Sequence, residues 1–142
     1  MSETSASYLR CRVGHQWYGI DVDHVLEVLH FVMLTELPGT SADILGMMTL
    51  RDLVMPVLDL RLHFGLTDAT LKLDSPIIAV RTDHGPMGLV VDDVDDIERV
   101  AKSQIASPED KSSPYVTGFA RLSNHLMLLL DVSRFRAQMP TV

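Results

Sequence analysis

Residues 46–59 read GMMTLRDLVMPVLD, two short apolar runs separated by the charged pair Arg51-Asp52. Apolar runs around a polar pair predict a β-hairpin, and Asp tolerates the left-handed backbone that a tight turn requires. The run over residues 53–58 is almost entirely apolar, which predicts a strand buried on both faces. Because proline has no N–H to donate, Pro56 is expected at a bulge, a strand end or an unpaired edge.

The same pattern returns 72 positions later, where residues 118–131 read GFARLSNHLMLLLD. Several glycine, aliphatic, methionine and aspartate positions coincide, and Asp52 is matched by Asn124, which also tolerates a left-handed turn. Arg51 is matched by Ser123 instead. If the shared residues build the fold, the unshared Arg51 is the better candidate for function.

A second repeat relates residues 19–28 to residues 88–97, which lie 69 positions later and share glycine, aliphatic, valine and acidic positions. We therefore predict one domain over residues 1–142 made of two copies of a β module, at roughly residues 8–68 and 74–136. Two copies are too few for a solenoid, which favours two related barrels or sheets that share a core.

Short strands between regular turn signals predict an all-β protein with minor short helices. One helical turn capped by Asp21 is expected before a strand over residues 25–32, and a longer helix through Leu29 stays open as an alternative. Short helices are also expected at residues 60–65 and 132–138, and loops at 35–42, 67–74 and 103–114. The other expected strands are residues 8–13, 16–20, 75–81, 87–91, 97–100, 115–122 and 126–131.

The composition is that of a globular domain, with 46% hydrophobic and 22% charged residues. A net charge of −7 argues against partners such as nucleic acid and anionic membrane surfaces. We expect neither a signal peptide nor a membrane span. The single cysteine, Cys11, cannot form an internal disulfide, which fits a cytoplasmic protein, and it is expected to be a small buried hydrophobe.

No catalytic, metal or cofactor site is predicted. The acidic run Asp92, Asp93, Asp95 and Asp96 offers oxygen ligands for Mg²⁺ or Ca²⁺ but lacks the spacing of a calcium loop, so a solvated turn is favoured. The histidines show no paired ligand spacing and are expected to be scattered surface residues; they are His15, His24, His30, His63, His84 and His125. No serine or cysteine has an activating context.

At these motifs the chain resembles the CheW-like domain family, the adaptors of bacterial chemotaxis arrays. The resemblance covers about residues 8–135 and rests on Gly19-Ile20-Asp21-Val22, Val25, Glu27-Val28, Leu37-Pro38, Leu45-Gly46, Leu50-Arg51, Pro56-Val57-Leu58-Asp59-Leu60, Gly88-Leu89-Val90-Val91-Asp92, Val94, Gly118 and Leu129-Leu130-Asp131. It implies two intertwined five-stranded SH3-like β-barrels with a shared hydrophobic core. It also implies no catalytic activity and no cofactor.

The resemblance further implies where partners bind. Glu27 and Arg51 are expected to lie close together near a receptor-binding groove to which Val25 and Gly46 contribute. Asp52 stands where the family commonly has glycine, offers Arg51 a second carboxylate, and is included in the candidate site. We expect Arg51 to be partly buried and to hold a carboxylate through its planar fork, although an ordinary solvated turn residue is the alternative.

One methionine side chain is also expected at a partner interface, because Met47 and Met48 are adjacent and one of them must point outward from a strand.

The predicted function is a non-catalytic, cytoplasmic adaptor that couples chemoreceptors to a CheA-type histidine kinase. Its expected partners are the regulatory domain of that kinase and the cytoplasmic tip of a methyl-accepting chemoreceptor, without insertion into the membrane. Two alternatives stay open. One is a CheW-like adaptor of a pilus, surface-sensing or biofilm pathway. The other is a small-ligand or divalent-metal sensor or hydrolase that uses residues 92–96.

Overall fold

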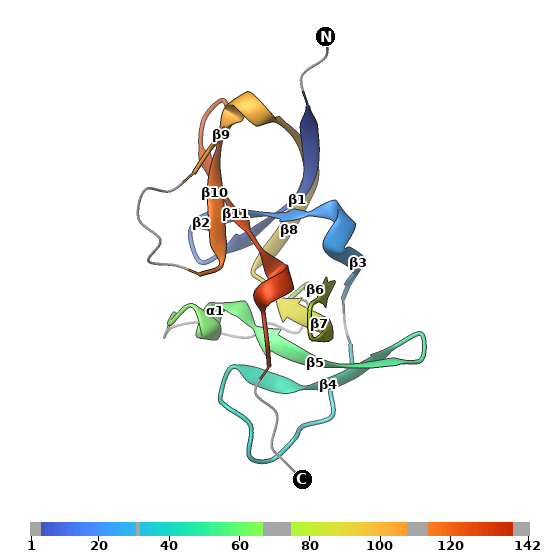
Figure 1. Cartoon of the computed structure of the whole chain (residues 1–142). Helices are drawn as coiled ribbons and strands as arrows, with labels where there is room; N and C mark the ends of the chain where they lie inside the picture. Colours follow the sequence, from blue (N-terminus) through green and yellow to red (C-terminus); the bar gives the residue numbers. More distant parts are fainter. Residues whose placement is uncertain (1–3, 31, 67–74, 108–113, 138–142) are drawn as a thin grey trace.

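The computed structural model describes residues 4–30, 32–66, 75–107 and 114–137. In this part of the chain, β-strands form two sheets that lie one above the other in Figure 1, with one short α-helix. The strands are β1 (Ser5–Val13), β2 (Gln16–Asp21), β3 (Val25–Leu29), β4 (Ile44–Leu50), β5 (Leu53–Asp59), β6 (Ile77–Thr82), β7 (Gly85–Val90), β8 (Asp93–Ala101), β9 (Ile105–Ala106), β10 (Val116–Arg121) and β11 (Leu126–Leu130). The helical elements are α1 (Leu60–His63) and the 3₁₀ turns η1 (Val22–His24), η2 (Lys102–Gln104) and η3 (Val132–Arg134).

Each sheet takes strands from both halves of the sequence. The six-stranded sheet has the order β8-β1-β2-β11-β10-β9, and the five-stranded sheet has the order β3-β6-β7-β5-β4. The predicted all-β, intertwined SH3-like architecture is therefore confirmed, with the two-residue β9 as an additional short strand of the first sheet. The two halves of the chain do not form separate bodies, because neither sheet is complete without strands from the other half.

Two parallel strand pairs join the halves, and they correspond to one another. In the first sheet β2 runs beside β11, with Gly19 opposite Leu129. In the second sheet β7 runs beside β5, with Gly88 opposite Val57. Gly88 lies 69 positions after Gly19, and Leu129 lies 72 positions after Val57. The same offsets that relate the sequence motifs thus relate the residues that pair across the halves.

The predicted hairpin forms from β4 and β5, and Arg51 and Asp52 make its two-residue turn. Their φ angles of 48° and 71° are both positive, as a type I′ turn requires. Pro56 precedes the part of β5 that pairs with β7, which agrees with its expected place at an unpaired edge. The expected burial of β5 on both faces is wrong at its start, where Leu53 and Val54 are 46% and 62% exposed.

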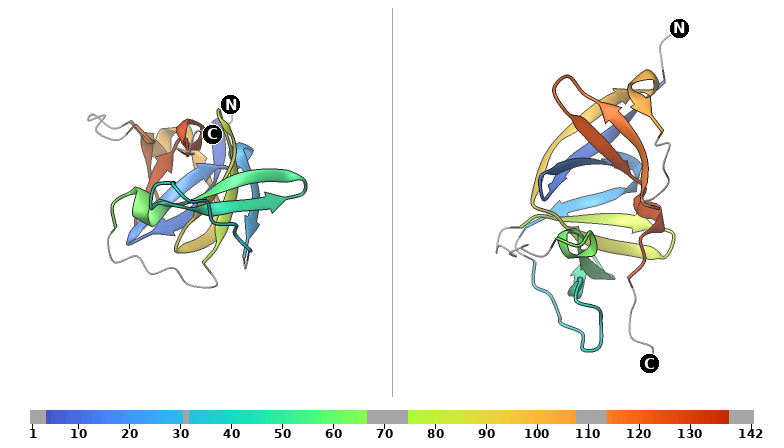
Figure 2. Two further views of the ribbon diagram at one scale, coloured as in Figure 1. Left: turned by 90° about the horizontal axis from the view of Figure 1, so that it is seen from below. Right: turned by 90° about the vertical axis from the view of Figure 1, so that its left-hand side faces the viewer.

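That exposure follows from the shape of the hairpin, whose tip projects beyond the sheet in both Figure 1 and Figure 2. The parallel neighbour β7 pairs with β5 only from Val57 onward, so the first residues of β5 have a partner on one side only. The second hairpin closes differently. Arg121 pairs with Leu126, which leaves a longer turn between them, and Asn124 does not share the positive φ predicted from its match to Asp52.

Several other predicted elements need correction in their limits. The acidic run is not a solvated turn, because residues from Asp93 onward lie inside β8, which pairs with β1 along its length. The expected strand from Val25 ends at Leu29. The expected turn before it is η1, where the Asp21 carboxylate accepts a hydrogen bond from the Asp23 N–H, so the longer helix is excluded. The expected link at residues 67–74 lies outside the described residues.

The largest hydrophobic cluster is shared by both sheets. It contains Cys11 and Ile20 from the six-stranded sheet and Leu58 and Leu89 from the five-stranded sheet, and all four are at most 1% exposed. Cys11 is the small buried hydrophobe that the sequence predicted, and its burial raises the pKa of its thiol to about 12.

Gly46 allows the segment before β4 to lie against that strand. Its φ is 150°, and a Cβ at this position would lie 2.6 Å from the carbonyl oxygen of Thr35. Thr35 pairs with Met47 through two backbone hydrogen bonds of 2.8 and 2.9 Å. Any side chain at residue 46 therefore collides with backbone that is itself held in place.

We predict that Gly46→Ala lowers the free energy of unfolding by about 2 kcal/mol or more, because it adds a backbone clash to the cost of a positive φ. Urea denaturation measures the loss. The matched control is Gly65→Ala, since Gly65 also has a positive φ of 83° but a Cβ there would meet no atom within 4 Å. Equal losses in the two variants would show that the contact with Thr35 has no energetic weight.

Candidate functional site at the junction of the two sheets

The structure brings Glu27 and Arg51 together, as expected. Nη2 of Arg51 lies 3.2 Å from Oε1 of Glu27. The Arg51 side chain is nevertheless 80% exposed and makes this single contact within the described residues, so the expected partly buried fork is wrong. Exposed ion pairs contribute little to stability. In the same part of the chain Asp52 forms no ion pair, so Glu27 is the carboxylate that Arg51 contacts.

The other residues expected at the site have different surroundings. Val25 lies opposite Val80 and packs against the shared core. Gly46 lies against Thr35, as described above. Met48 is only 2% exposed and Met47 is half-buried, so Met47 is the methionine of the pair that reaches the surface, and its place at a partner interface stays a prediction.

A groove of about 840 Å³ lies where β8, the end of β3 and the start of β6 meet. We call it the junction groove; it is lined by Leu9, Val28, His30, Ser75, Pro76, Asp92, Asp93, Val94, Asp95, Asp96 and Ile97. Ile97 is 61% exposed in it, although it belongs to a strand. Val28 directly follows Glu27 on β3, and successive strand residues alternate faces. The groove and the Glu27–Arg51 pair therefore lie on opposite faces of the same strand.

Sequence reasoning missed this groove. Its apolar residues come from β1, β3 and β8, and only the pairing of β1 with β8 brings Leu9 opposite Ile97. A usable signal was present in the acidic run, where Ile97 is an apolar residue beside four carboxylates.

At one end of the junction groove, Asp92 is fixed by hydrogen bonds that include one from the buried Arg61. The Asp92 carboxylate accepts hydrogen bonds from Nη1 of Arg61 at 3.2 Å and from the Gly14 N–H at 2.7 Å. Arg61 is 3% exposed and also donates from Nε and Nη2 to Asp59, at 3.1 and 3.2 Å. Burial alone would lower the pKa of the Arg61 guanidinium, but the hydrogen bonds and charges of Asp59 and Asp92 outweigh burial and raise it.

A second arginine forms ion pairs with acidic side chains of β8. Arg10 pairs with Asp95 and Glu98, and its guanidinium lies 4.7 Å from the centre of the Trp17 ring. The hydrogen bond from Arg10 is the main cause that lowers the pKa of the Asp95 carboxyl. Because Asp92 and Asp95 already bind arginines, the acidic run is not arranged as a set of ligands. Within the described residues, no group of three or more His, Cys, Asp or Glu side chains could hold a metal ion.

His63 is not the scattered surface residue that we expected. Its Nδ1 lies 2.8 Å from Oδ2 of Asp43, and its ring packs against Tyr115 and Phe135 at centroid distances of 5.5 and 5.7 Å. Burial alone would raise the pKa of Asp43, but hydrogen bonds from Ser41 and His63 outweigh it and lower that pKa. The contact ties the segment before β4 to the end of α1.

The sequence model of the CheW-like domain matches residues 7–138. This chain belongs to the CheW-like domain family. It is 28% identical over 131 residues to the chemotaxis protein CheW of Klebsiella aerogenes, covering 89% of this chain and 79% of that protein. It is 30% identical over 117 residues to protein FrzA of Myxococcus xanthus, covering 80% of this chain and 73% of that protein.

The fold agrees with the family. The crystal structure of the scaffolding protein TtCheW from Thermoanaerobacter tengcongensis superimposes with a TM-score of 0.84, at 27% identity and with 90% of each chain covered. The chain is therefore a CheW-like chemotaxis adaptor. In the described part of this CheW-like chain, no helix is both long and apolar enough to cross a membrane.

We predict that Arg61→Gln lowers the free energy of unfolding by about 3 kcal/mol, because it leaves the buried Asp59 carboxylate without its cation. The matched control is Arg51→Gln, which removes an exposed pair and should change stability by no more than about 0.5 kcal/mol. Urea denaturation of both variants gives the comparison, and losses of similar size would contradict this assignment of buried and exposed pairs.

The lowered pKa of Asp43 predicts a dependence on pH. A carboxyl with a lowered pKa in the folded state adds stability above its pKa in the unfolded state, and this contribution is lost as the pH falls through the lower folded-state value. Asp43→Asn should therefore destabilise the protein at pH 7, and its deficit should be smaller at about pH 3, below the ordinary pKa of an aspartate. Urea midpoints at both pH values test this, with Asp83→Asn at an exposed carboxyl as the control. A deficit that is equal at the two pH values would contradict it.

Proposed function

We propose that this CheW-like chain couples chemoreceptors to a CheA-type histidine kinase without catalysing a reaction, and that the receptor binds in the junction groove. The observation that carries the proposal is an apolar groove with an acidic rim where the two sheets meet. The Glu27–Arg51 pair lies on the opposite face of β3. Because β3 is the edge strand of its sheet, a partner that extends past this edge would contact the pair as well.

The chemistry of the groove favours a helical partner. Leu9, Val28 and Ile97 offer an apolar surface, and a helix that lies in such a groove inserts apolar side chains spaced three or four residues apart. Asp93 and Asp96 remain on the rim and would attract lysine or arginine on the partner. We therefore expect an amphipathic helix with basic flanks, and an interaction that weakens as salt concentration rises.

A separate surface is needed for the kinase, and the two hairpin tips supply one at each sheet. Val54 is 62% exposed at the β4–β5 tip, and Leu126, 72 positions later, is 50% exposed at the β10–β11 tip. We assign the regulatory domain of the kinase to the β10–β11 tip, because the turn of the β4–β5 tip carries Arg51, which we propose contacts the receptor. An adaptor that holds two partners raises their local concentration, which requires geometry and no chemistry. The proposal places the chain in the cytoplasm, where these partners would meet it.

A second candidate is an adaptor with the same geometry that serves other receptors and another output, such as pilus, surface-sensing or biofilm control. It is supported by the similarity to a relative whose name is not that of a chemotaxis protein, FrzA. Co-purification from native cells would distinguish the two, because it names the receptor.

We also propose that the chain is one domain made of two copies of a β module, at roughly residues 8–68 and 74–136. The shared offsets of 69 and 72 positions between the two parallel pairings support this proposal.

We predict that Ile97→Glu reduces receptor recruitment at least about tenfold, because it places a charge in the apolar part of the groove. The matched control is Met33→Glu, since Met33 is 92% exposed and does not line the groove. Pull-down with receptor-containing membranes measures recruitment, and circular dichroism checks folding. Arg51→Ala should also weaken recruitment while the protein stays folded. Full recruitment by Ile97→Glu would remove the groove from the receptor site.

A further inference from the structure

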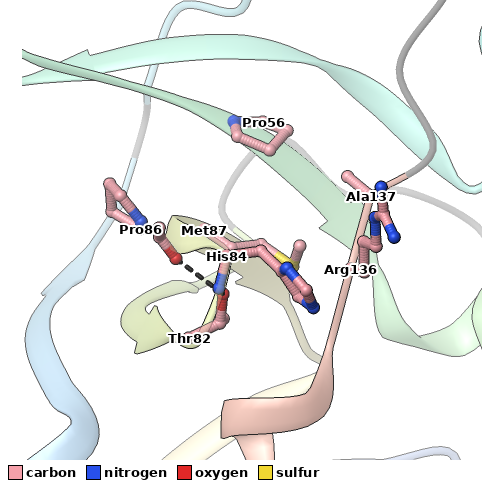
Figure 3. A pocket seen from close by; sticks show the side chains of 8 residues that line it. Pro56, Thr82, His84, Pro86, Met87, Arg136 and Ala137 are labelled. Carbon is pink, nitrogen blue, oxygen red and sulfur yellow. Dashed lines mark hydrogen bonds between the residues drawn. The ribbon is translucent and has the colours of Figure 1, made fainter.

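A second hollow, of about 740 Å³, lies between β5, the β6–β7 turn and the segment after η3 (Figure 3). We call it the Arg136 hollow; it is lined by Pro56, Thr82, His84, Gly85, Pro86, Met87, Arg136 and Ala137. It shares no lining residue with the junction groove. Neither the sequence motifs nor the proposed receptor and kinase contacts account for it.

Two prolines open this hollow. In the six-stranded sheet the parallel pairing of β11 with β2 starts at Met127 opposite Trp17. In the five-stranded sheet the corresponding pairing of β5 with β7 starts later, at Val57. Each of the two strand pairs that would come earlier contains one proline, Pro56 on β5 or Pro86 on β7. A proline has no N–H to donate to a neighbouring strand. The two strands therefore pair over a shorter length, and space remains between their first residues.

At the corresponding place in the other sheet, the protein fills the space with its own side chains. Phe64 packs against Tyr18 at a centroid distance of 5.5 Å, and a methyl group of Leu66 lies against Gly14. The Gln16 amide donates to the carbonyl oxygen of Leu126 at 3.2 Å, which links the starts of β2 and β11.

The sequence offsets identify what stands in those positions around the hollow. Arg136 lies 72 positions after Phe64, and Gly85 lies 69 positions after Gln16. The aromatic ring of Phe64 thus corresponds to the guanidinium of Arg136. The bridging amide of Gln16 corresponds to Gly85, which has no side chain. Among the described residues, the Arg136 hollow is the same place in the fold without the aromatic ring and the amide that its counterpart contains.

Arg136 supplies the positive charge among the described residues that line the hollow. Arg136 is exposed and forms no ion pair among the described residues, and His84 donates its backbone N–H to Oγ1 of Thr82. In the part of the chain that the structure describes, no carboxylate lines the hollow, although the chain carries a net charge of −7. Met87 is 3% exposed and supplies an apolar wall beside Pro56.

We propose that the Arg136 hollow docks an extended segment of a partner protein in which a carboxylate stands next to an apolar side chain. The carboxylate would bind at Arg136 and His84, because an arginine fork is a strong partner for that group. The apolar side chain would take the place against Met87 and Pro56 that corresponds to the place Phe64 fills in the other sheet. This surface is additional to the receptor and kinase contacts proposed above.

The test uses two short peptides and the ¹⁵N-labelled protein. Acetyl-Leu-Glu-Leu-amide should shift the amide signals of His84, Gly85, Met87 and Ala137, and acetyl-Leu-Gln-Leu-amide should bind at least about tenfold more weakly. Arg136→Gln should lower the affinity for the glutamate peptide by about tenfold. The matched control is Arg134→Gln, because Arg134 lies on the same segment and is 63% exposed but pairs with Asp131; it should bind like the unchanged protein.

A second variant reproduces at residue 136 the side chain that stands at the corresponding place in the other sheet. Arg136→Phe places the ring of Phe64 at the corresponding position and should abolish binding of the glutamate peptide while the protein stays folded. Should this variant fail to fold, Arg136→Gln carries the test alone. The inference is overturned if the two peptides bind equally, if the shifts lie elsewhere, if Arg136→Gln binds normally, or if sodium acetate at the same concentration produces the same shifts, which would assign the hollow to small carboxylates.

Discussion

The fold depends on two parallel strand pairs that cross between the halves of the chain. At each crossing the pairing residue is a glycine, and the reason is space. A Cβ on Gly19 would lie 2.9 Å from the terminal methyl of Met127, and a Cβ on Gly88 would lie 2.9 Å from that of Met48. The methionine ends can move aside, but a Cβ on Gly19 would also lie 3.1 Å from Cβ of Tyr8, and a Cβ on Gly88 would lie 3.0 Å from Cγ2 of Ile77. Close packing against neighbouring strands therefore favours glycine at both crossings.

Buried charge links these crossings to the candidate site. Asp59 begins α1 by accepting a hydrogen bond from the Arg61 N–H, and the same arginine reaches Asp92 at the end of the junction groove. The second half has Asp131 in the corresponding capping position, but Ser133 replaces the arginine. The arginine thus joins the helix, the groove and the Gly14 turn in one half only. This difference positions Asp92 at the groove, because Asp92 cannot rotate without losing its hydrogen bonds from Arg61 and from the Gly14 N–H.

The sequence predicted those features that depend on neighbouring residues. The hairpin around Arg51-Asp52, the cap at Asp21 and the unpaired edge at Pro56 each follow from local backbone chemistry. Features that depend on distant pairing were not predicted from local patterns, and the intertwined architecture came from the family resemblance. Apolar residues predicted burial for Val54, because a sequence does not show where a neighbouring strand stops. The closeness of Glu27 and Arg51 came from family resemblance, whereas the junction groove arises only when β1 pairs with β8, and no local pattern encodes that pairing.

The interlaced topology also affects how the protein folds. The strands β1 and β2 are neighbours in the sequence and pair with one another, but their outer partners β8 and β11 lie far along the chain, at Asp93–Ala101 and Leu126–Leu130. Such long-range pairing slows folding. The chain loses conformational entropy when the ends of a long loop meet, and stabilising contacts form only afterwards. Before β8 and β11 pair with it, the β1–β2 hairpin has two unpaired edges, and unpaired strand edges are open to association with other chains.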